Sequence, residues 1–341
     1  MTLPPLSVAM AVHNGMPYLE TSVRSILAQT FGDFEFVIGD DGSSDGSTEL
    51  LRRFASADGR IRLLRRESKS GLAASANWVA GEARAPLIAI AHADDYSYPR
   101  RLEREVALLR AYPDAVLVGT LSDGIDEAGR RVRPVDAWRL THASPFAPFA
   151  HSSIMFRREA FAAVGGYRAE AEYWEDLDLY FRLSGRGRLL VVPETLSSVR
   201  HARTSTRLRD EGERVENAVD TMYRAAAAFW AGEDYEAVLS RPRTPGEKLH
   251  PRTFVARGST RLWSGRSPQV LRQMLRRGGL GANPQSLQAL LWGAWGELSP
   301  RTLRLLIRSL LRLGNLAARP RLAGRDSVEW RPRPRRTGGR G

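Results

Sequence analysis

The sequence predicts an α/β fold in which a mostly parallel sheet is flanked by helices and followed by a C-terminal helical extension. Over the first half of the chain, short apolar runs alternate with runs of about 10–12 residues whose apolar positions recur at helical spacing. This alternation is typical of βαβ units and therefore of a parallel sheet. Beyond about residue 209 the pattern is helical throughout. Hydrophobic residues make up 43% of the 341 residues, which is enough for a large domain with its own core and an appendage.

The expected elements follow one another with clear breaks between them. His13-Asn14-Gly15 ends the first apolar run, and Pro17 then stands where the first turn of a helix tolerates proline. The expected strands are residues 6–12, 34–39, 61–64, 87–91, 115–119, 152–156 and 189–192. The expected helices are residues 18–29, 48–57, 72–81, 100–112, 158–164 and 176–183.

The positive charge of the chain is concentrated in its C-terminal third. Residues 245–341 hold 20 Lys and Arg against 4 Asp and Glu, so the first 244 residues carry a net charge of −3 although the whole chain carries +13. One expected helix has arginines on one face and aliphatic side chains on the other: Arg301, Arg304, Arg308, Arg312, and Leu303, Leu306, Ile307, Leu310. Such a segment suits an anionic membrane, an acidic glycan or nucleic acid. It could equally pack its leucines against the rest of the protein and expose its arginines to solvent.

Composition also bounds the organisation of the chain and its chemistry. We expect an α/β domain over residues 1–208, a helical region over 209–316 and a disordered basic tail over 317–341, which is rich in Arg, Pro and Gly. The absence of cysteine excludes disulfides and thiolate metal sites, so any metal must have oxygen or imidazole ligands. No signal-like segment and no uncharged apolar stretch of about 18 residues occurs, and we therefore expect a cytoplasmic protein.

Polar clusters follow three of the expected strands. His13-Asn14 follows the first, Asp40-Asp41 the second and Asp94-Asp95 the fourth. Ligands of parallel α/β sheets bind beyond the carboxyl ends of the strands. One such cluster alone could be a turn, but three at the same edge of a sheet indicate a binding site.

The pair Asp94-Asp95 directly follows an apolar strand. Placing two adjacent anions beside a core strand is costly unless a positive charge compensates them, and a divalent cation is the natural partner of carboxylate oxygens. Such an ion could bridge phosphate oxygens and stabilise a leaving diphosphate. A helix cap near Pro99 would explain one of the two aspartates but not both.

Two further acidic pairs have a functional and a local interpretation. A carboxylate of Asp40-Asp41 can accept hydrogen bonds from a nucleobase or ribose, or it can form an Asx turn into the next helix. In Glu175-Asp176, an aspartate could act as general base towards an acceptor hydroxyl, with Tyr173 and Trp174 as a platform for a sugar ring. The dipole of a helix that begins at Asp176 would also favour acidic residues there.

Several ordered motifs together resemble the family 2 glycosyltransferases, which have the GT-A fold, a Rossmann-like sheet flanked by helices. The resemblance spans roughly residues 6–205. The matching segments are residues 8–15, 18–19, 25–31, 33–46, 71–77, 93–95, 99–103, 151–153, 165–167 and 175–179.

The resemblance implies a role for each matching residue. His13 takes the position of a tyrosine that stacks on the nucleobase, Asp41 that of the aspartate that binds the base, and Asp176 that of the catalytic base. The implied donor-binding residues are His13, Asn14, Asp40, Asp41, Lys69, Asn77 and Asp94. The implied acceptor-binding residues are His151, Ser152, Trp174 and Glu175. The implied metal ligands are Asp94, Asp95 and His201, with Mn²⁺ or Mg²⁺ as the ion.

The family pattern implies an inverting transfer from a nucleotide diphosphate sugar, with a UDP-sugar favoured, to a glycan or lipid-linked glycan. Cell-surface polysaccharide or glycolipid synthesis would suit this activity, with the enzyme in the cytoplasm or peripheral at the inner face of the membrane. The sequence departs from the pattern at His13, which replaces tyrosine, and at His92, which replaces the first aspartate of Asp-Ala-Asp-Asp.

Three other functions remain as alternatives. A nucleotidyltransferase also uses paired aspartates, but it would normally carry a glycine-rich basic loop near the N-terminus, which His13-Asn14-Gly15 is not. A non-catalytic nucleotide- or sugar-binding relative would share the motifs. A nucleic-acid-binding protein would suit the arginine-rich tail, but no zinc-finger or RNP-like pattern accompanies it, and we expect no nucleic-acid partner.

Overall fold

The computed structural model describes residues 3–133, 149–171, 173–201, 213–231, 233–240, 321–324 and 327–330. The chain divides into two compact units, Met1–Ala202 with Ala318–Pro332, and Arg203–Ala317 with Arg333–Gly341. In the second unit, the described elements are α8 (Glu213–Ala231) and α9 (Glu236–Leu239). The expected arginine and leucine helix near residues 301–312 lies outside the described residues. In the part that is described, no helix combines the length and the apolar character needed to cross a membrane.

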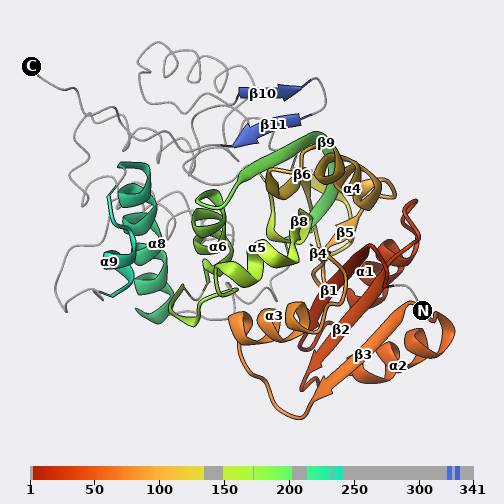
Figure 1. Cartoon of the computed structure of the whole chain (residues 1–341). Helices are drawn as coiled ribbons and strands as arrows, with labels where there is room; N and C mark the ends of the chain where they lie inside the picture. Colours follow the sequence, from red (N-terminus) through yellow and green to blue (C-terminus); the bar gives the residue numbers. More distant parts are fainter. Residues whose placement is uncertain are drawn as a thin grey trace, which may run out of the picture. The chain divides into compact units, whose positions relative to one another are not determined.

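Four parallel strands form one half of the sheet in the first unit (Figure 1). They lie in the order β3-β2-β1-β4 and are connected by three helices, as the alternating pattern predicts. The strands are β1 (Leu6–Val12), β2 (Glu35–Asp41), β3 (Ile61–Arg66) and β4 (Leu87–Ile90), and the helices are α1 (Leu19–Leu27), α2 (Ser47–Ala57) and α3 (Leu72–Gly81). Because these strands are parallel, the ends of β1, β2 and β4 meet at one edge of the sheet.

The other half of the sheet mixes strand directions. β8 lies antiparallel between β4 and β6, whereas β6 and β9 are parallel to each other. Two short strands extend this half, since β5 pairs with β9 and β7 with β6. The strands are β5 (Tyr96–Ser97), β6 (Ala115–Ile125), β7 (Arg131–Arg133), β8 (Ile154–Arg157) and β9 (Arg188–Arg200), and the helices are α4 (Arg101–Ala111), α5 (Arg158–Ala163) and α6 (Glu175–Ser184). The prediction of a mostly parallel sheet flanked by helices is confirmed.

β6 and β9 continue well beyond the apolar runs that predicted them. Their second halves pair with each other through buried polar residues, and the Ser122 and Ser197 hydroxyls lie 2.6 Å apart. Ser198 also bonds the buried Asp123. Hydropathy underestimates these strands because polar side chains that satisfy one another can line a buried pair of strands.

The tail that the sequence favours as disordered contains two strands. β10 (Arg321–Gly324) and β11 (Ser327–Trp330) are antiparallel, and β11 adds to the outer edge of β9 with Val328 opposite Val191. An edge strand offers unpaired backbone donors and acceptors, and Val328 and Trp330 alternate with polar residues as a strand requires. The arginines and prolines around this short segment obscure its alternation in the sequence.

An ion pair lies in the core beneath β4 and β8. The side chains of Arg101 and Glu105 on α4 are both fully buried, and Arg101 Nε lies 3.2 Å from Glu105 Oε1. The Arg101 guanidinium also donates to the carbonyls of Ile90 and Ile154, at 2.7 and 3.2 Å. Arg101 therefore ties α4 to the ends of two strands, and its hydrogen bonds offset part of the cost of burying its charge.

Glu105 should make stability depend on pH. Burial, only partly opposed by Arg101, raises its pKa to about 7, above its ordinary value of 4.5. A raised pKa gives a stabilising contribution that is complete below pH 4.5 and is lost as the pH rises to about 7. We expect Glu105→Gln to gain stability relative to the wild type over this range, by up to about 3 kcal/mol. Urea unfolding of both proteins at several pH values measures the difference, and a constant difference would contradict this assignment.

Candidate active site

The loops after β1 and β2 are held together by hydrogen bonds. Asn14, in the left-handed region with φ 54°, donates its backbone N–H to Ser43 Oγ at 3.0 Å. Its side-chain oxygen accepts the Ser44 N–H at 2.9 Å, and Gly15 N–H donates to Ser47 Oγ at 3.0 Å. Asn14 tolerates this backbone conformation better than most residues. Two of the three polar clusters thus form one continuous surface at the sheet edge.

Asp40 and Asp41 are both buried, but their carboxylates have different partners, because successive strand residues point to opposite faces. The Asp40 carboxylate accepts the Ser43 N–H at 3.0 Å and the Thr48 hydroxyl, so it holds the turn into α2. The Asp41 carboxylate accepts the backbone N–H of Ser70 at 2.8 Å and the Ser70 hydroxyl at 2.9 Å. Asp41 thereby fixes the loop that precedes α3.

His13 contacts the backbone of Asp41, and Lys69 belongs to the loop before α3 that the Asp41 carboxylate holds. His13 Nδ1 lies 2.8 Å from the carbonyl oxygen of Asp41, which can only accept, so Nδ1 carries the proton. The contact fixes the orientation of the half-buried ring. Lys69 is exposed in the loop before Gly71, beside Ser70.

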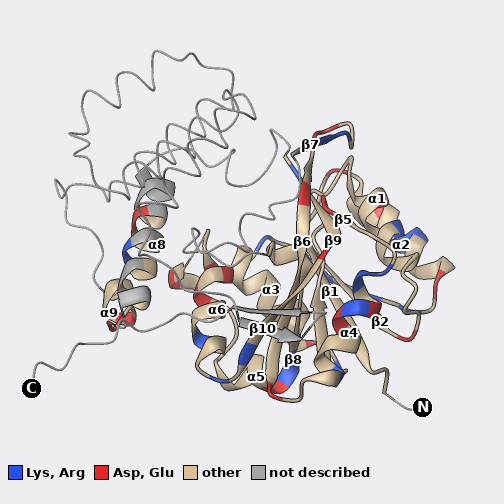
Figure 2. Cartoon of the chain, turned by 90° about the horizontal axis from the view of Figure 1, so that it is seen from above, with Lys and Arg blue, Asp and Glu red and all other residues tan. Residues whose placement is uncertain are grey.

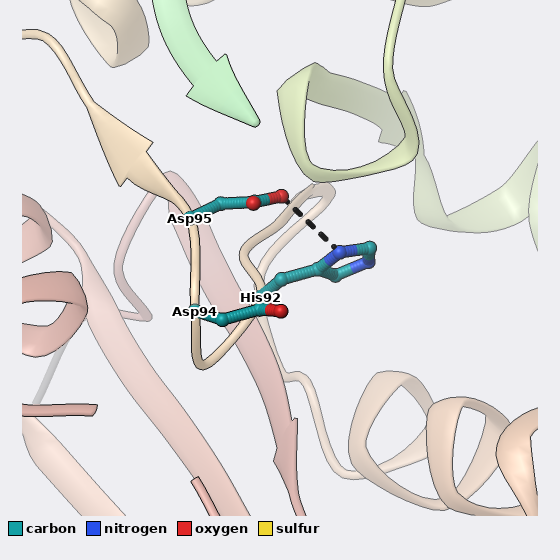
Figure 3. A group of neighbouring side chains, drawn as sticks. All are labelled: His92, Asp94 and Asp95. Atoms are coloured by element: carbon teal, nitrogen blue, oxygen red, sulfur yellow. Dashed lines mark ion pairs between the residues drawn. The ribbon is translucent and has the colours of Figure 1, made fainter. Parts of the chain in front are cut away.

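His92, Asp94 and Asp95 form a compact group after β4. One potential ligand atom from each residue lies within 4.8 Å of the others, and the three side chains point to the same side of the loop (Figure 3). His92 Nδ1 is 3.4 Å from Asp95 Oδ2. Burial and the charge of Asp95 raise the pKa of Asp94 to about 6. Burial opposes the ionisation of Asp95, but its contacts with His92, Ser152 and the Arg200 backbone outweigh this and lower its pKa.

Arg200, the last residue of β9, holds this loop in place. Its backbone N–H donates to Asp95 Oδ1 at 2.8 Å, and its Nε donates to the Asp94 carbonyl at 2.8 Å. Its guanidinium also donates to the Asp126 carbonyl at 2.8 Å and lies 4.4 Å from the centre of the Tyr18 ring. The buried Arg200 therefore joins the loop after β4 to the turn after β6 and to the start of α1.

A chain of hydrogen bonds leads from His92 through His151 to Tyr167. His92 Nε2 lies 2.9 Å from His151 Nδ1, and His151 Nε2 lies 2.7 Å from the Tyr167 hydroxyl. The side-chain amide of Asn77 bonds both backbone groups of Tyr167 at 2.8 Å. Burial disfavours the charged form of His92, but the charges of Asp95, Asp94 and Asp176 outweigh it and raise the His92 pKa. Burial and the charge of His92 hold the pKa of His151 well below its usual value.

The start of α6 places acidic residues beside these groups, shown red in Figure 2. Asp176 Oδ1 accepts the Leu177 N–H at 2.7 Å. The negative charge of Asp176 reaches His92 and, after burial and Glu175, contributes to raising the pKa of Tyr167. Asp176 therefore lies within electrostatic range of the group after β4, although 81 residues separate it from Asp95 in the sequence.

Two kinds of comparison with known proteins agree with this geometry. The model of the family described as "Glycosyl transferase family 2" matches residues 7–165. The putative glycosyltransferase EpsE of Bacillus subtilis (strain 168) is 32% identical over 223 residues, which cover 63% of this chain and 80% of EpsE. The chain belongs to glycosyl transferase family 2. It is therefore a glycosyltransferase.

One further relative and two solved structures share less sequence identity with this glycosyltransferase. The O-antigen biosynthesis glycosyltransferase WbnJ of Escherichia coli is 29% identical over 183 residues, covering 52% of this chain and 71% of WbnJ. S. aureus TarS 1–349 in complex with UDP superposes with a TM-score of 0.51 at 15% identity, covering 88% of this chain and 82% of that one. The mannosyltransferase PcManGT from Pyrobaculum calidifontis, in complex with GDP-Man and Mn²⁺, gives 0.50 at 18% identity, covering 92% and 82%. These likenesses support the GT-A fold.

The residues that the family pattern assigns to this transferase fall into groups in the structure. It brings His13, Asn14 and Asp41 together at one loop surface, and Asp94 and Asp95 at another. His201 follows Arg200 but is not a member of the group formed by His92, Asp94 and Asp95, as judged over the described residues.

Four other expected residues contact protein groups or are buried, and the ligand-binding roles of Asn77, His151 and Ser152 stay predictions. The Asn77 amide is committed to the Tyr167 backbone, His151 bonds His92, and Ser152 lies beside Asp95. Trp174 is 1% exposed, so its ring is not an exposed platform for a sugar.

Sequence reasoning assigned no role to Arg200 or Tyr167. Arg200 is one of many arginines in the chain, and nothing in the sequence distinguishes its buried position at the end of β9. Tyr167 belongs to the segment 165–167 that carries part of the family resemblance, and that segment is the signal that could have identified it.

Proposed function

We propose that this glycosyltransferase moves a sugar from a nucleotide diphosphate sugar to an acceptor hydroxyl, with inversion and with the help of a divalent cation. The observation that carries the proposal is the compact group of His92, Asp94 and Asp95 after β4, which the charge of Asp176 reaches at His92. A candidate base and a candidate cation site therefore line the same part of the sheet edge. An inverting displacement needs both on opposite sides of the reacting carbon, and it needs no nucleophile from the enzyme.

The loops after β1 and β2 are suited to the nucleoside of the donor. His13 offers an oriented flat ring for stacking, and Asn14 and Asp41 offer polar groups beside it. Lys69 is exposed close to the same loop, where a positive charge would attract a phosphate. The structures of TarS with UDP or UDP-GlcNAc, and of PcManGT with GDP-Man, support a nucleotide-linked donor, with UDP-sugars favoured. Asp40 remains a proposed donor contact beside Asp41, because both carboxylates hold neighbouring loops, Asp40 at Ser43 and Asp41 at Ser70.

The residues after β4 fit a divalent cation. The carboxylates of Asp94 and Asp95 offer ligand oxygens close together, and Arg200 orients Asp95 through its backbone N–H. A bound cation would supply positive charge to the diphosphate as it leaves the sugar. Mn²⁺ beside GDP-Man in PcManGT supports this choice of ion. The role of Asp94 and Asp95 is to hold that charge next to the donor.

Asp176 is the proposed general base. It stands at the start of α6, whose N-terminal dipole favours its ionised form. In that form it can take the proton from the acceptor hydroxyl as the hydroxyl oxygen attacks the anomeric carbon. Glu175 lies next to it, and its proposed role is to position the acceptor.

The acceptor proposed here is a glycan or a lipid-linked glycan in cell-surface polysaccharide synthesis. The O-antigen biosynthesis glycosyltransferase WbnJ, which shares 29% identity with this chain, supports that class of acceptor. A lipid-linked acceptor would require the enzyme to work at a membrane surface. Residues 301–312, for which the sequence pattern predicts a helix with arginines on one face, are the part of the sequence suited to such a surface.

The proposal is tested by thermal shift of the purified chain with UDP, GDP, dTDP and CDP, each with and without Mn²⁺. A ligand present at about 100 times its Kd stabilises the folded state by about 2.7 kcal/mol, which raises Tm by about 5 °C or more for a domain of this size. We expect one nucleotide, with UDP favoured, to give such a shift only when Mn²⁺ is present. Nucleosides without phosphate are the control. The absence of a shift with all four diphosphates would contradict the proposed donor class.

A further inference from the structure

His92 has one ring nitrogen towards the two aspartates and the other towards a second histidine. Its Nδ1 faces Asp95 Oδ2, and its Nε2 faces His151 Nδ1 at 2.9 Å. The two rings meet edge to face with centroids 5.0 Å apart, and His151 and Tyr167 meet in the same way at 5.3 Å. His92 is thus anchored at Nε2 by a partly buried chain of hydrogen bonds, while Nδ1 points to the carboxylates.

We infer that His92 is itself a ligand of the cation, through Nδ1, and that its imidazole makes the site prefer Mn²⁺ or Co²⁺ to Mg²⁺. His151 and Tyr167 act as positioning residues that fix the His92 ring for this role. The inference rests on the proposed function for the presence of a divalent cation, but the identity of the ligand set and of the preferred ion goes beyond it.

The hydrogen-bond chain allows only one arrangement of protons when Nδ1 binds a metal. A ligating Nδ1 must present its lone pair, so the ring proton of His92 is on Nε2. His151 Nδ1 then accepts that proton's hydrogen bond, and His151 Nε2 carries a proton that it donates to the Tyr167 hydroxyl at 2.7 Å. Histidine ligands of metals almost always donate their other N–H in this way, which fixes the tautomer and the ring orientation.

Each end of this chain is fastened to the fold. The Asn77 amide holds both backbone groups of Tyr167, and a β-carbon at Gly166 would come within 2.5 Å of the Asn77 side-chain oxygen. At the carboxylate end of the chain, the backbone N–H of Arg200 donates to Asp95 Oδ1, and the other oxygen, Oδ2, faces His92. Two of the three ligands therefore have supports that orient them before a cation arrives, which is the arrangement that favours tight and selective binding.

The preference for Mn²⁺ or Co²⁺ follows from the chemistry of imidazole. Mg²⁺ favours oxygen ligands and retains water, whereas nitrogen ligands increase affinity for later first-row transition metals. The neutral imidazole of His92 also contributes no negative charge to the site, which lowers affinity for Mg²⁺ more than for an ion that binds nitrogen well. A site of this composition should therefore distinguish the ions more strongly than one built from carboxylates alone.

The test is calorimetric titration of the full chain with Mg²⁺, Mn²⁺ and Co²⁺, each alone and in the presence of UDP, with Co²⁺ absorption spectra of the same samples. We expect His92→Asp to reduce the preference for Co²⁺ over Mg²⁺ by about tenfold or more and to change the Co²⁺ spectrum. Equal selectivity and identical spectra for wild type and His92→Asp would overturn the inference, as would the absence of metal binding to the wild type in both series.

A matched pair of variants tests the supporting role of His151. The side-chain oxygen of Asn can replace the acceptor at Nδ1, whereas Leu, of similar size, cannot, so His151→Leu should weaken Co²⁺ binding by about tenfold or more and His151→Asn should restore much of it. Equal loss of Co²⁺ affinity in both variants would overturn the proposed positioning role of His151.

The inference and the proposed function can fail separately. Metal selectivity that behaves as expected without sugar transfer would contradict the proposed function alone. Sugar transfer with unaltered metal selectivity in His92→Asp would contradict this inference alone.

Discussion

Asp176→Asn should lower turnover by about a thousandfold and leave donor binding unchanged. Asparagine keeps the shape of the side chain, and its oxygen can still accept the Leu177 N–H, so the start of α6 should be preserved. It cannot accept the proton of the acceptor hydroxyl, and removing a general base typically costs about 10²–10⁴ in rate. Steady-state kinetics with the donor found by thermal shift gives kcat, and calorimetry gives the Kd of the nucleotide.

Asp176→Asn also removes a negative charge near the site, so a control variant must remove a negative charge nearby without removing the proposed base. Glu170→Gln removes an exposed negative charge a few residues before α6, at a position that we assign no role in the site. It should have nearly wild-type kcat. Turnover by Asp176→Asn within a few fold of the wild type would remove Asp176 from the mechanism, even if the metal group behaves as proposed.

Asp95→Asn should abolish most of the metal-dependent part of nucleotide binding. The amide can still accept the Arg200 N–H, so the loop should keep its position, but a neutral oxygen is a weak ligand for a hard cation. We expect the affinity for UDP in the presence of Mn²⁺ to fall by about 100-fold or more, because a direct ligand should matter at least as much as the outer residues that orient it.

The same titration with a chelator provides the internal control for Asp95→Asn. Without metal, the wild type and the variant should bind the nucleotide equally weakly, since His13, Asn14 and Asp41 belong to a different loop surface. An affinity in Mn²⁺ equal to that of the wild type would show that Asp95 is not a ligand. A loss in both conditions would indicate that the substitution disturbs the loop as a whole.

Local sequence patterns were sufficient for most of the first 200 residues. β1 and α3 have the predicted limits, because apolar residues at the correct spacing are bounded there by clear breakers such as His13-Asn14-Gly15 and Gly71. The extensions of β6 and β9 could not be predicted in the same way. Ser122 and Ser197 stabilise each other across 75 residues, and each is an unremarkable polar residue within its own segment.

The sequence predicted where the site residues lie in the sheet better than it predicted their hydrogen-bond partners. The strand-end clusters are at the expected edge, but the different commitments of Asp40 and Asp41 depend on loops that follow them, at Ser43 and at Ser70. The contact between His92 and His151 joins residues 59 apart. No spacing rule predicts such a pair, since it requires β4 and β8 to be neighbours in the sheet.

The pairing of β11 with β9 means that the transferase unit is discontinuous in the sequence. During synthesis, the strands from β1 to β9 leave the ribosome well before residues 327–330. Until those residues arrive, the outer edge of β9 has backbone donors and acceptors without their final strand partner, and unpaired edges of this kind readily join other chains. Once residues 327–330 have paired, β11 covers the edge of the same strand whose last residue, Arg200, holds the loop of Asp94 and Asp95.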